Sequence, residues 1–381
     1  MDDINKKDIE EILDNSHEPC LTLLMPTETI AGEAVDKMKI RYKNLIKEGE
    51  KKLKERWNYS DEDVQKFLKP LKKYLNDRDF WLNQSSGLVM LKDKDNFAYY
   101  RLPVKFREKV ALEKHFHIKP YVSEILSERR FFLLAVSRNS CRFFQGTPRD
   151  IEEITIEDLP QGIDALIADE DLESSTQQHS AARGGASVIH HGHDDRDQKA
   201  PAELLRYLKA INSSLKPHFQ DKNLPLIVMC VKDLFPHLKK VFEYQNLLDK
   251  FIQGNPDRLS PEELLDKARP IIEPHFKHPY NEMAEKYQEL KGSENTSAQI
   301  EEIAPASYQG RIANLLVSAA KDKNGIYHSD KGEIELGLNP PEGYDLINFS
   351  VINTLKTGGD IYLFSGDEIP DNSNICAIFR Y

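Results

Sequence analysis

The strongest constraint on the fold is the way in which the apolar residues of this chain are grouped. They fall into short runs bounded by Pro, Gly or polar residues, and runs of this kind are typical of buried β-strands. Between them lie longer stretches in which apolar residues recur every three or four positions, as on one face of a helix. Strands mixed with helices in this way predict an α/β protein. The clearest strand runs are CLTLLM (20–25), FFLLAV (131–136), LIVMCV (226–231) and ICAIFRY (375–381).

The 381 residues exceed what one hydrophobic core organises, since domains commonly hold about 100–150 residues. A set of short strands over 86–119 indicates antiparallel pairing and closes a first region. Asn255-Pro256-Asp257 marks a second break. We therefore predict three domains: a mixed α/β domain over 1–125, a middle α/β domain over 126–256 and a C-terminal α/β domain over 257–381.

Several classes of protein are disfavoured by what the sequence lacks. The four cysteines form no CxxC pair, so neither a zinc ribbon nor a thioredoxin-like motif is expected. No phosphate-binding loop and no HExxH pattern occurs, and we predict no cofactor. The first residues are polar and acidic, and no apolar run approaches the roughly 18 residues of a membrane span. We expect a cytoplasmic protein without a membrane partner.

A predicted helix over 32–57 is the most basic part of the chain. From Lys37 to Trp57 there are nine Lys/Arg and three Glu, although the whole chain carries a formal charge of −11. One interpretation is a stripe that contacts an RNA backbone, and the other is a solvated helix face with ordinary Lys/Glu pairs. The candidate RNA-binding residues on this helix are Lys37, Lys39, Arg41, Lys43 and Lys47.

A long polar segment over 173–199 has no core-facing pattern and predicts an exposed loop. It contains Gly184-Gly185, preceded by Arg183 and followed by Ala186. Paired glycines allow positive φ and let backbone N–H groups approach a ligand, where they can stabilise an oxyanion. The alternative is a flexible loop with no catalytic task, since paired glycines are common. Arg183 is a further candidate for contact with RNA.

The same loop holds a second constellation, in which histidines are crowded beside carboxylates. His190, His191 and His193 precede Asp194-Asp195, and such groups can bind a divalent metal. A metal site needs a rigid frame, which a single loop does not supply. A solvated His-rich loop, or one that contacts phosphates when protonated, stays open as an alternative.

Two further patterns lead to structural expectations. His115 and His117 flank Phe116 in an apparent strand, so we expect both imidazoles on an exposed face. Ser260-Pro261-Glu262-Glu263 is a strong helix start. The prolines at 270, 274 and 279 are expected to break the helix that follows.

The order of these parts resembles the bacterial branch of the archaeo-eukaryotic release factor superfamily, relatives of Pelota and the class-one release factors. The residues that carry the resemblance are the hairpin RFFLLAVSRNSCRFFQG, the Gly-Gly loop, the strand PLIVMCV and the ending NICAIFRY. The similarity covers residues 126–381. It implies an RNase H-like middle domain and a small α/β/α C-terminal domain similar to a ribosomal protein.

The resemblance also implies a function for the loop. In that family a Gly-Gly-Gln tripeptide enters the ribosomal peptidyl-transferase centre and promotes hydrolysis of peptidyl-tRNA. Gly184 and Gly185 match its glycines, and Ala186 stands in place of the Gln. Alanine keeps the backbone N–H but removes the side-chain amide, so whether the chain is an enzyme is left open. Residues 1–125 show no codon-reading motif.

Three hypotheses follow. The first is a ribosome-associated factor acting in release, rescue or dormancy, with rRNA, peptidyl-tRNA and a translational GTPase as partners. The second is peptidyl-tRNA hydrolysis at a site formed by Gly184, Gly185 and Ala186. The third is a protein that never meets the ribosome and uses the His190–Asp195 loop as a metal-binding or nuclease-like site.

Overall fold

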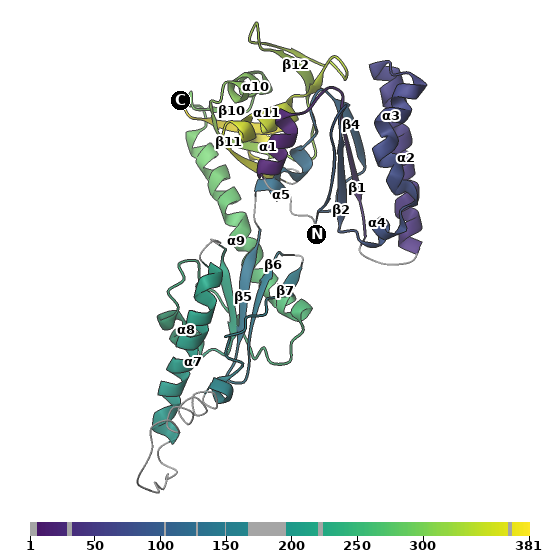
Figure 1. Cartoon of the computed structure of the whole chain (residues 1–381). Helices are drawn as coiled ribbons and strands as arrows, with labels where there is room; N and C mark the ends of the chain where they lie inside the picture. The colour runs from purple at the N-terminus through teal and green to yellow at the C-terminus, as the bar shows by residue number, and fades with distance from the viewer. Residues whose placement is uncertain are drawn as a thin grey trace, which may run out of the picture. The chain divides into compact units, whose positions relative to one another are not determined.

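In a computed structural model, the chain folds into two compact units, and each unit combines β-structure with helices (Figure 1). Unit 1 combines residues 1–127 with 280–381, and unit 2 holds residues 128–279. The three-domain division with boundaries at 125 and 256 stays a prediction. The structure describes residues 6–28, 33–102, 104–126, 129–148, 150–166, 196–219, 224–364 and 368–381.

The N-terminal part of unit 1 is a four-stranded antiparallel sheet in the order β3-β2-β1-β4. Register is set at the central strand, where Leu23 pairs with Met90 on one side and with Val110 on the other. The elements are α1 (Lys6–Asp14), β1 (Cys20–Pro26), α2 (Glu33–Trp57), α3 (Asp61–Lys72), η1 (Lys73–Asn76), α4 (Arg78–Leu82), β2 (Gly87–Lys92), β3 (Phe97–Leu102), β4 (Lys109–Glu113), η2 (Lys119–Tyr121) and α5 (Val122–Leu126).

Both faces of this sheet are buried, and the period of two along β1 assigns its side chains to two cores. Leu21, Leu23 and Met25 belong to a core shared with α2 and α3. Cys20 and Leu24 belong to a second core, which C-terminal residues of unit 1 complete. Apolar residues of α2 that recur at spacings of three, four and seven are buried in the first core: Met38, Tyr42, Leu45, Ile46 and Leu53.

The C-terminal part of unit 1 contains two sheets, with strand orders β10-β16-β11-β15 and β13-β12-β14. β11 runs parallel to β15 and antiparallel to β16. The helices α10 and α11 contribute to the second core together with Phe116 and Ile118. The elements are β10 (Thr296–Ser297), α10 (Ile300–Tyr308), β11 (Ile312–Ser318), β12 (Asn324–His328), β13 (Glu333–Leu336), β14 (Tyr344–Asp345), α11 (Leu346–Lys356), β15 (Asp360–Phe364), η4 (Pro370–Asn372) and β16 (Ile375–Phe379).

Unit 2 is a mixed five-stranded sheet in the order β7-β6-β5-β8-β9. β5 pairs antiparallel with β6 and parallel with β8. Side chains of α7 and α8 pack on one face, and those of the first part of α9 pack on the other. The elements are β5 (Phe131–Val136), β6 (Cys141–Gly146), β7 (Ile151–Glu153), α7 (Arg196–Phe219), β8 (Leu226–Cys230), α8 (Phe235–Val241), β9 (Ile252–Gln253) and α9 (Pro261–Leu290), whose residues 261–279 belong to unit 2 and whose remaining residues belong to unit 1.

Two structural expectations were wrong. The helix after Ser260 is not broken, because α9 continues through Pro270, Pro274 and Pro279 to Leu290. A proline removes one N–H donor and bends a helix without necessarily ending it. The start was predicted correctly: the Glu263 N–H donates to Ser260 Oγ, and the Glu263 carboxylate accepts from the Ser260 N–H.

The second wrong expectation concerns residues 115–118, which form no strand. His117 is fully buried instead of lying on an exposed face. Within the described ranges, no helix combines the length and the apolar character that crossing a membrane demands. The residues that the structure describes form an α/β protein with four sheets.

Candidate functional site

The predicted loop site falls in the part of the sequence between unit 2's first strands and α7. Arg183, Gly184, Gly185 and Ala186 lie outside the described residues, and so do His190, His191 and His193. Their roles stay predictions.

The residues that flank this loop site are described on both sides. Ile163 is buried, and its N–H donates to the Arg138 carbonyl at 2.8 Å. After the loop, α7 buries Tyr207, Leu208 and Ile211 in the core of unit 2. The loop site is therefore bounded on both sides by packed elements.

The predicted basic helix is α2, and its candidate residues do not all lie on one face. Lys37, Lys43 and Lys47 are exposed opposite the buried stripe. Lys39 is half-buried at the flank. Arg41 is occupied: its Nε lies 2.6 Å from Glu108, and its guanidinium donates to the Pro26 carbonyl. Only the three exposed lysines form the kind of free cationic row that contacts phosphates.

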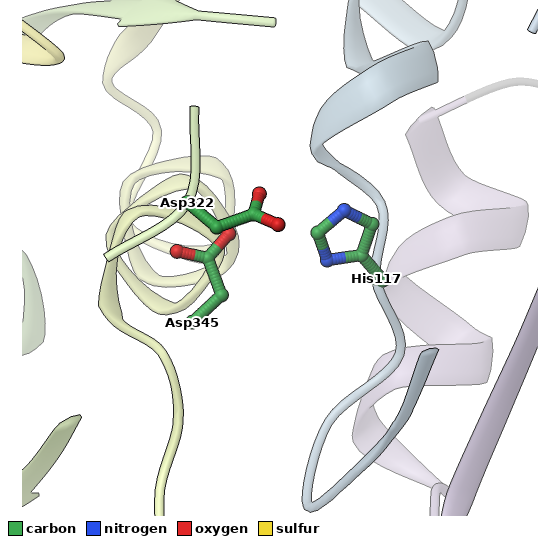
Figure 2. Close-up of side chains that lie close together, drawn as sticks. All are labelled: His117, Asp322 and Asp345. Atoms are coloured by element: carbon green, nitrogen blue, oxygen red, sulfur yellow. The ribbon is translucent and has the colours of Figure 1, made fainter. Parts of the chain in front are cut away.

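Unit 1 also contains a cluster of charged groups that sequence analysis missed, and all of its members except Asp322 are buried. Glu113 ends β4, His117 lies in the connection that follows, and Lys119 begins η2. Asp322 lies in the connection between β11 and β12, and Asp345 precedes α11. Figure 2 shows the imidazole of His117 facing the carboxylates of Asp322 and Asp345.

An asparagine holds the backbone of this cluster in place. Asn348 Oδ1 accepts from the N–H groups of Ile118 and Lys119 at 2.9 and 3.0 Å. Its Nδ2 donates to the Phe116 carbonyl at 2.9 Å. Asn348 belongs to the first turn of α11, so this helix fixes the path of residues 116–119. The positions of His117 and Lys119 follow from that clamp.

The ammonium of Lys119 is the centre of the cluster. It is fully buried and donates to three oxygens: the Lys321 carbonyl at 2.6 Å, Asp322 at 2.8 Å and Asp345 at 2.9 Å. A buried ammonium has three N–H groups to satisfy, and all three have acceptors here. Lys109 adds a second contact to Asp322 at 2.6 Å.

The acidic groups of the cluster respond differently to their surroundings. Burial, reinforced by the neighbouring Asp345 carboxylate, raises the pKa of Glu113 to about 7. Burial alone would also raise the pKa of Asp322, but Lys119 and Lys109 more than reverse this and hold it below its usual range. The two lysines therefore keep Asp322 charged, whereas Glu113 takes up a proton near neutrality.

His117 is the neutral member of the cluster. Burial, with the positive charges of Lys109 and Lys119, holds the pKa of His117 well below its usual range. Neither ring nitrogen has a hydrogen-bond partner among the described residues. The imidazole is therefore an uncharged ring aimed at two carboxylates.

His117, Asp322 and Asp345 raise the question of a metal, since one donor atom from each lies within 4.8 Å of the others. An imidazole and two carboxylates suit a divalent transition metal. However, the Lys119 ammonium already donates to both carboxylates, and it would face any added ion at close range. The cluster fits an ion-pair network in which Lys119 supplies the positive charge.

Two signals in the sequence pointed toward this cluster. Asp345 stands directly before an apolar helical stretch, which is the pattern of a helix N-cap, and its carboxylate does accept from the Ile347 N–H at 3.1 Å. Lys119 follows an apolar run and precedes Pro120. Neither signal identifies the partner, because more than 200 residues separate Lys119 from Asp345.

The comparisons with known proteins bear on the middle of the chain. Residues 130–311 match the family model described as Bacterial archaeo-eukaryotic release factor family 3. Comparison with curated protein sequences gives no match.

Comparison with solved structures finds similar chains at low sequence identity, among them the following three. The archaeal translation termination factor aRF1 is 13% identical, with 99% of each chain covered and a TM-score of 0.24. Dom34 from S. cerevisiae, described as a translation termination-like factor, is 9% identical, with 100% of this chain and 94% of that chain covered and a TM-score of 0.36. Pelota, in a model of ribosome-bound archaeal Pelota and ABCE1, is 11% identical, with 80% and 74% covered and a TM-score of 0.36.

The segment matched by the family model contains the described strands of unit 2, the predicted loop site at residues 183–193, and the whole of α9. Over residues 130–311, this chain is similar to Bacterial archaeo-eukaryotic release factor family 3.

Proposed function

We propose that this protein is a ribosome-associated translation factor that acts in release, rescue or dormancy. The observation that carries the proposal is the family match over residues 130–311, which includes the Gly184-Gly185 loop. The free lysines of α2 support contact with rRNA. A cytoplasmic location and a translational GTPase partner belong to the same proposal.

The fold of unit 2 agrees with this proposal. A mixed sheet, antiparallel on one side of β5 and parallel on the other, is covered by helices on both faces. This arrangement supports the RNase H-like sandwich that the family resemblance implies. In unit 1, the sheet β10-β16-β11-β15 with α10 and α11 supports the small C-terminal α/β/α domain.

Hydrolysis of peptidyl-tRNA is the finer part of the proposal. In this reaction water attacks the ester carbonyl that joins the peptide to tRNA, and the oxygen of that carbonyl gains negative charge. Backbone N–H groups of Gly185 and Ala186 are suited to stabilising that oxygen, since glycine leaves the approach open. The side chain of Ala186 has no amide group that could position the water, so we expect slow hydrolysis.

Ribosome association is tested by co-sedimentation of the full-length protein with ribosomes at several salt concentrations. We expect binding that weakens steeply as salt rises, because phosphate contacts release counterions. Failure to co-sediment with any ribosomal state at low salt would overturn the proposal.

Hydrolysis is tested by the release of labelled peptide from programmed ribosomes. We expect Gly185→Ala to reduce release and Ala186→Gln to increase it. Gly192→Ala, in the same loop but away from the tripeptide position, is the matched control and should behave as wild type. If Gly185→Ala and the control release peptide equally fast, the loop is not the catalyst.

The non-ribosomal alternative, a metal-binding or nuclease-like protein using His190, His191 and His193, stays a prediction. Elemental analysis of protein purified without a His-tag tests it. Stoichiometric metal that is lost on substitution of these histidines would support this alternative.

A further inference from the structure

The helices α2 and α3 form an antiparallel pair on one face of the N-terminal sheet (Figure 1). Three contacts fix how they lie against each other: Tyr42 Oη donates to the Leu71 carbonyl at 2.8 Å, and Lys54–Asp61 and Lys72–Glu50 form ion pairs at 2.6 and 3.9 Å. The C-terminal half of α3 therefore returns alongside the middle and N-terminal half of α2.

The lysines of α2 fall into two groups that differ in pairing. In the C-terminal half, Lys51 pairs with Glu55 at 3.9 Å, and Lys54 pairs with Asp61. In the first 15 residues of the helix, Lys37, Lys43 and Lys47 are exposed and form no ion pair with any residue of the described ranges. Only the second group presents charge that is free to meet a ligand.

The second helix of the pair carries free lysines as well. Lys66 and Lys69 on α3 and Lys73 at the start of η1 are exposed, and no described residue forms an ion pair with them. Spacings of three and four residues place them on one side of the helix, opposite the buried Val64 and Phe67. Sequence analysis did not single out these residues.

The charge of the helix pair contrasts with that of the whole chain. Residues 33–76 contain thirteen Lys/Arg and eight Asp/Glu, a net of +5 in a chain whose formal charge is −11. Paired basic groups neutralise their neighbours, so most of the basic charge that has no partner among the described residues lies on the exposed lysines. An isolated basic surface on an acidic protein selects a polyanion as its partner.

The chemistry of this surface also indicates how it binds. Lysine ammonium groups are compact point charges that attract phosphates without a fixed planar geometry. Across residues 35–76, every one of which is described, no aromatic side chain is exposed, so there is no platform on which an unpaired base could stack. Phosphate contacts alone position a nucleic acid without reading its sequence.

We propose that the free lysines of α2 and α3 form one surface that binds the phosphate backbone of folded, base-paired RNA without sequence preference. This deepens the proposed ribosome association, on which it rests, by naming the element that contacts RNA and the form of RNA contacted. The surface consists of Lys37, Lys43, Lys47, Lys66, Lys69 and Lys73, and it excludes Arg41.

Three double variants of the full-length protein test this surface with equal changes of charge. Lys43→Gln/Lys47→Gln removes free lysines of α2, and Lys69→Gln/Lys73→Gln removes free lysines from the C-terminal end of α3 and η1. Lys51→Gln/Lys54→Gln is the matched control, since it removes two paired lysines from α2. Binding to a base-paired RNA of arbitrary sequence is measured by fluorescence anisotropy between low and physiological salt.

We expect each free-lysine variant to weaken binding and to reduce the slope of log K against log salt by about two, or about one per lysine. The control variant should keep a slope within about half a unit of wild type. Changing the RNA sequence at constant secondary structure should leave the affinity of the wild type unchanged. Unfolding midpoints close to wild type establish that all three variants are folded.

The inference would be overturned if the α3 variant bound RNA like wild type, or if the control lost as much RNA affinity as the free-lysine variants. It would also be overturned if the wild type bound single-stranded RNA more tightly than base-paired RNA. The free-lysine variants are also tested for binding to anionic vesicles. If they lose vesicle binding but keep RNA binding, the surface contacts a membrane instead of RNA. If all variants still co-sediment with ribosomes at every salt concentration, this surface falls while ribosome association stands. If the wild type itself does not co-sediment, the proposed function falls.

Discussion

The Nζ atom of Lys119 lies 2.9 Å from the carboxylate of Asp345, although 226 residues separate the two in the sequence. Both side chains are buried, with 0% and 1% of their surface exposed. The contact joins the segment after β4 to the N-terminus of α11 within unit 1. The first and last parts of the chain are therefore tied by a charged pair as well as by a shared apolar core.

Replacing Lys119 by methionine should destabilise unit 1 by about 3–5 kcal/mol, because it leaves the buried Asp345 carboxylate without its counter-charge. The double variant Lys119→Met/Asp345→Asn should recover much of this loss, since it removes both charges and keeps a capping residue on α11. Urea unfolding followed by tryptophan fluorescence measures the effect, because both tryptophans, Trp57 and Trp81, lie in unit 1.

Lys109→Met is the control for burial. Its pair with Asp322 is partly exposed on both sides, at 31% and 41%, so its loss should cost about 1 kcal/mol or less. Equal losses for Lys119→Met and Lys109→Met would contradict the role assigned to burial.

Glu113 and His117 should make opposite contributions to the pH dependence of unfolding. The carboxyl of Glu113 moves from an ordinary pKa of 4.5 to about 7 in the fold. The folded chain therefore holds its proton between these values, and the stability from Glu113 falls as pH rises. His117 stays neutral when buried but is protonated below its ordinary pKa of 6.5 on unfolding, so its contribution falls as pH drops.

Glu113→Gln should therefore gain stability relative to wild type as pH rises from 4.5 to 7, by up to about 1.4 kcal/mol per pH unit. His117→Gln should gain stability relative to wild type as pH falls below 6.5, which is the opposite direction. Free energies of unfolding from urea titrations at pH 5, 6 and 7 check both signs. The charged groups facing Glu113 are Lys109, Asp322 and Asp345. If the stability of Glu113→Gln and that of wild type changed in parallel with pH, Glu113 would not be the group that takes up the proton.

Zinc should discriminate between the native cluster and a variant that lacks the ammonium. Lys119→Ala leaves His117, Asp322 and Asp345 facing one another without the ammonium that donates to both carboxylates, and Lys109 still contacts Asp322. Zinc at about 100 times its Kd should then stabilise unit 1 of the variant by about 2.7 kcal/mol, while leaving unit 1 of the wild type unchanged. Stabilisation of the wild-type unit by zinc, read from tryptophan fluorescence, would mean that Lys119 is not the resident cation.

Two glycines of unit 1 should respond to alanine in opposite ways. At Gly49, within α2, an added Cβ meets Leu21 and Val110 at ordinary contact distances of 3.7 and 3.8 Å. Gly49→Ala should stabilise by about 0.5–1 kcal/mol, since glycine is a poor helix former.

At Gly87 in β2, an added Cβ lies 2.0 Å from the Val104 carbonyl oxygen. Gly87→Ala should therefore destabilise, by about 1–3 kcal/mol as expected for overpacking. Circular dichroism melting curves compare the two variants. A loss of stability in Gly49→Ala would show that α2 packs more tightly on the sheet than these distances indicate.

Local rules predicted the parts of the fold that depend on neighbours in sequence. Ser60 caps α3 by accepting from the Asp63 N–H at 3.2 Å, and the Asp63 carboxylate closes the capping box. The hairpin of β5 and β6 turns at residues 137–140 because Ser137 Oγ accepts from two turn N–H groups. These signals operate over a few residues, so one sequence carries them completely.

The buried cluster could not be predicted in the same way. His117 alternates with apolar residues as a side chain on a half-exposed strand would, yet Asn348 of α11 holds its segment in a loop. The pattern is local, whereas the partners that bury His117 come from the other end of the chain. Leu205 on α7 shows the same limit, because it lies at the helical spacing of the buried Leu208 and is nevertheless 42% exposed.

The composition of unit 1 has a consequence for the order in which a growing polypeptide acquires structure. Ile9 and Leu13 of α1 share a core with Ile375 and Ala377 of β16, so this core cannot close until almost the entire chain has been synthesised. All strands of unit 2 emerge earlier and lie between these parts in the sequence. We therefore expect unit 2 to fold first on the nascent chain. Until its C-terminal partners are synthesised, one apolar face of β1 and β2 stays exposed, and we expect chaperones to protect it from aggregation.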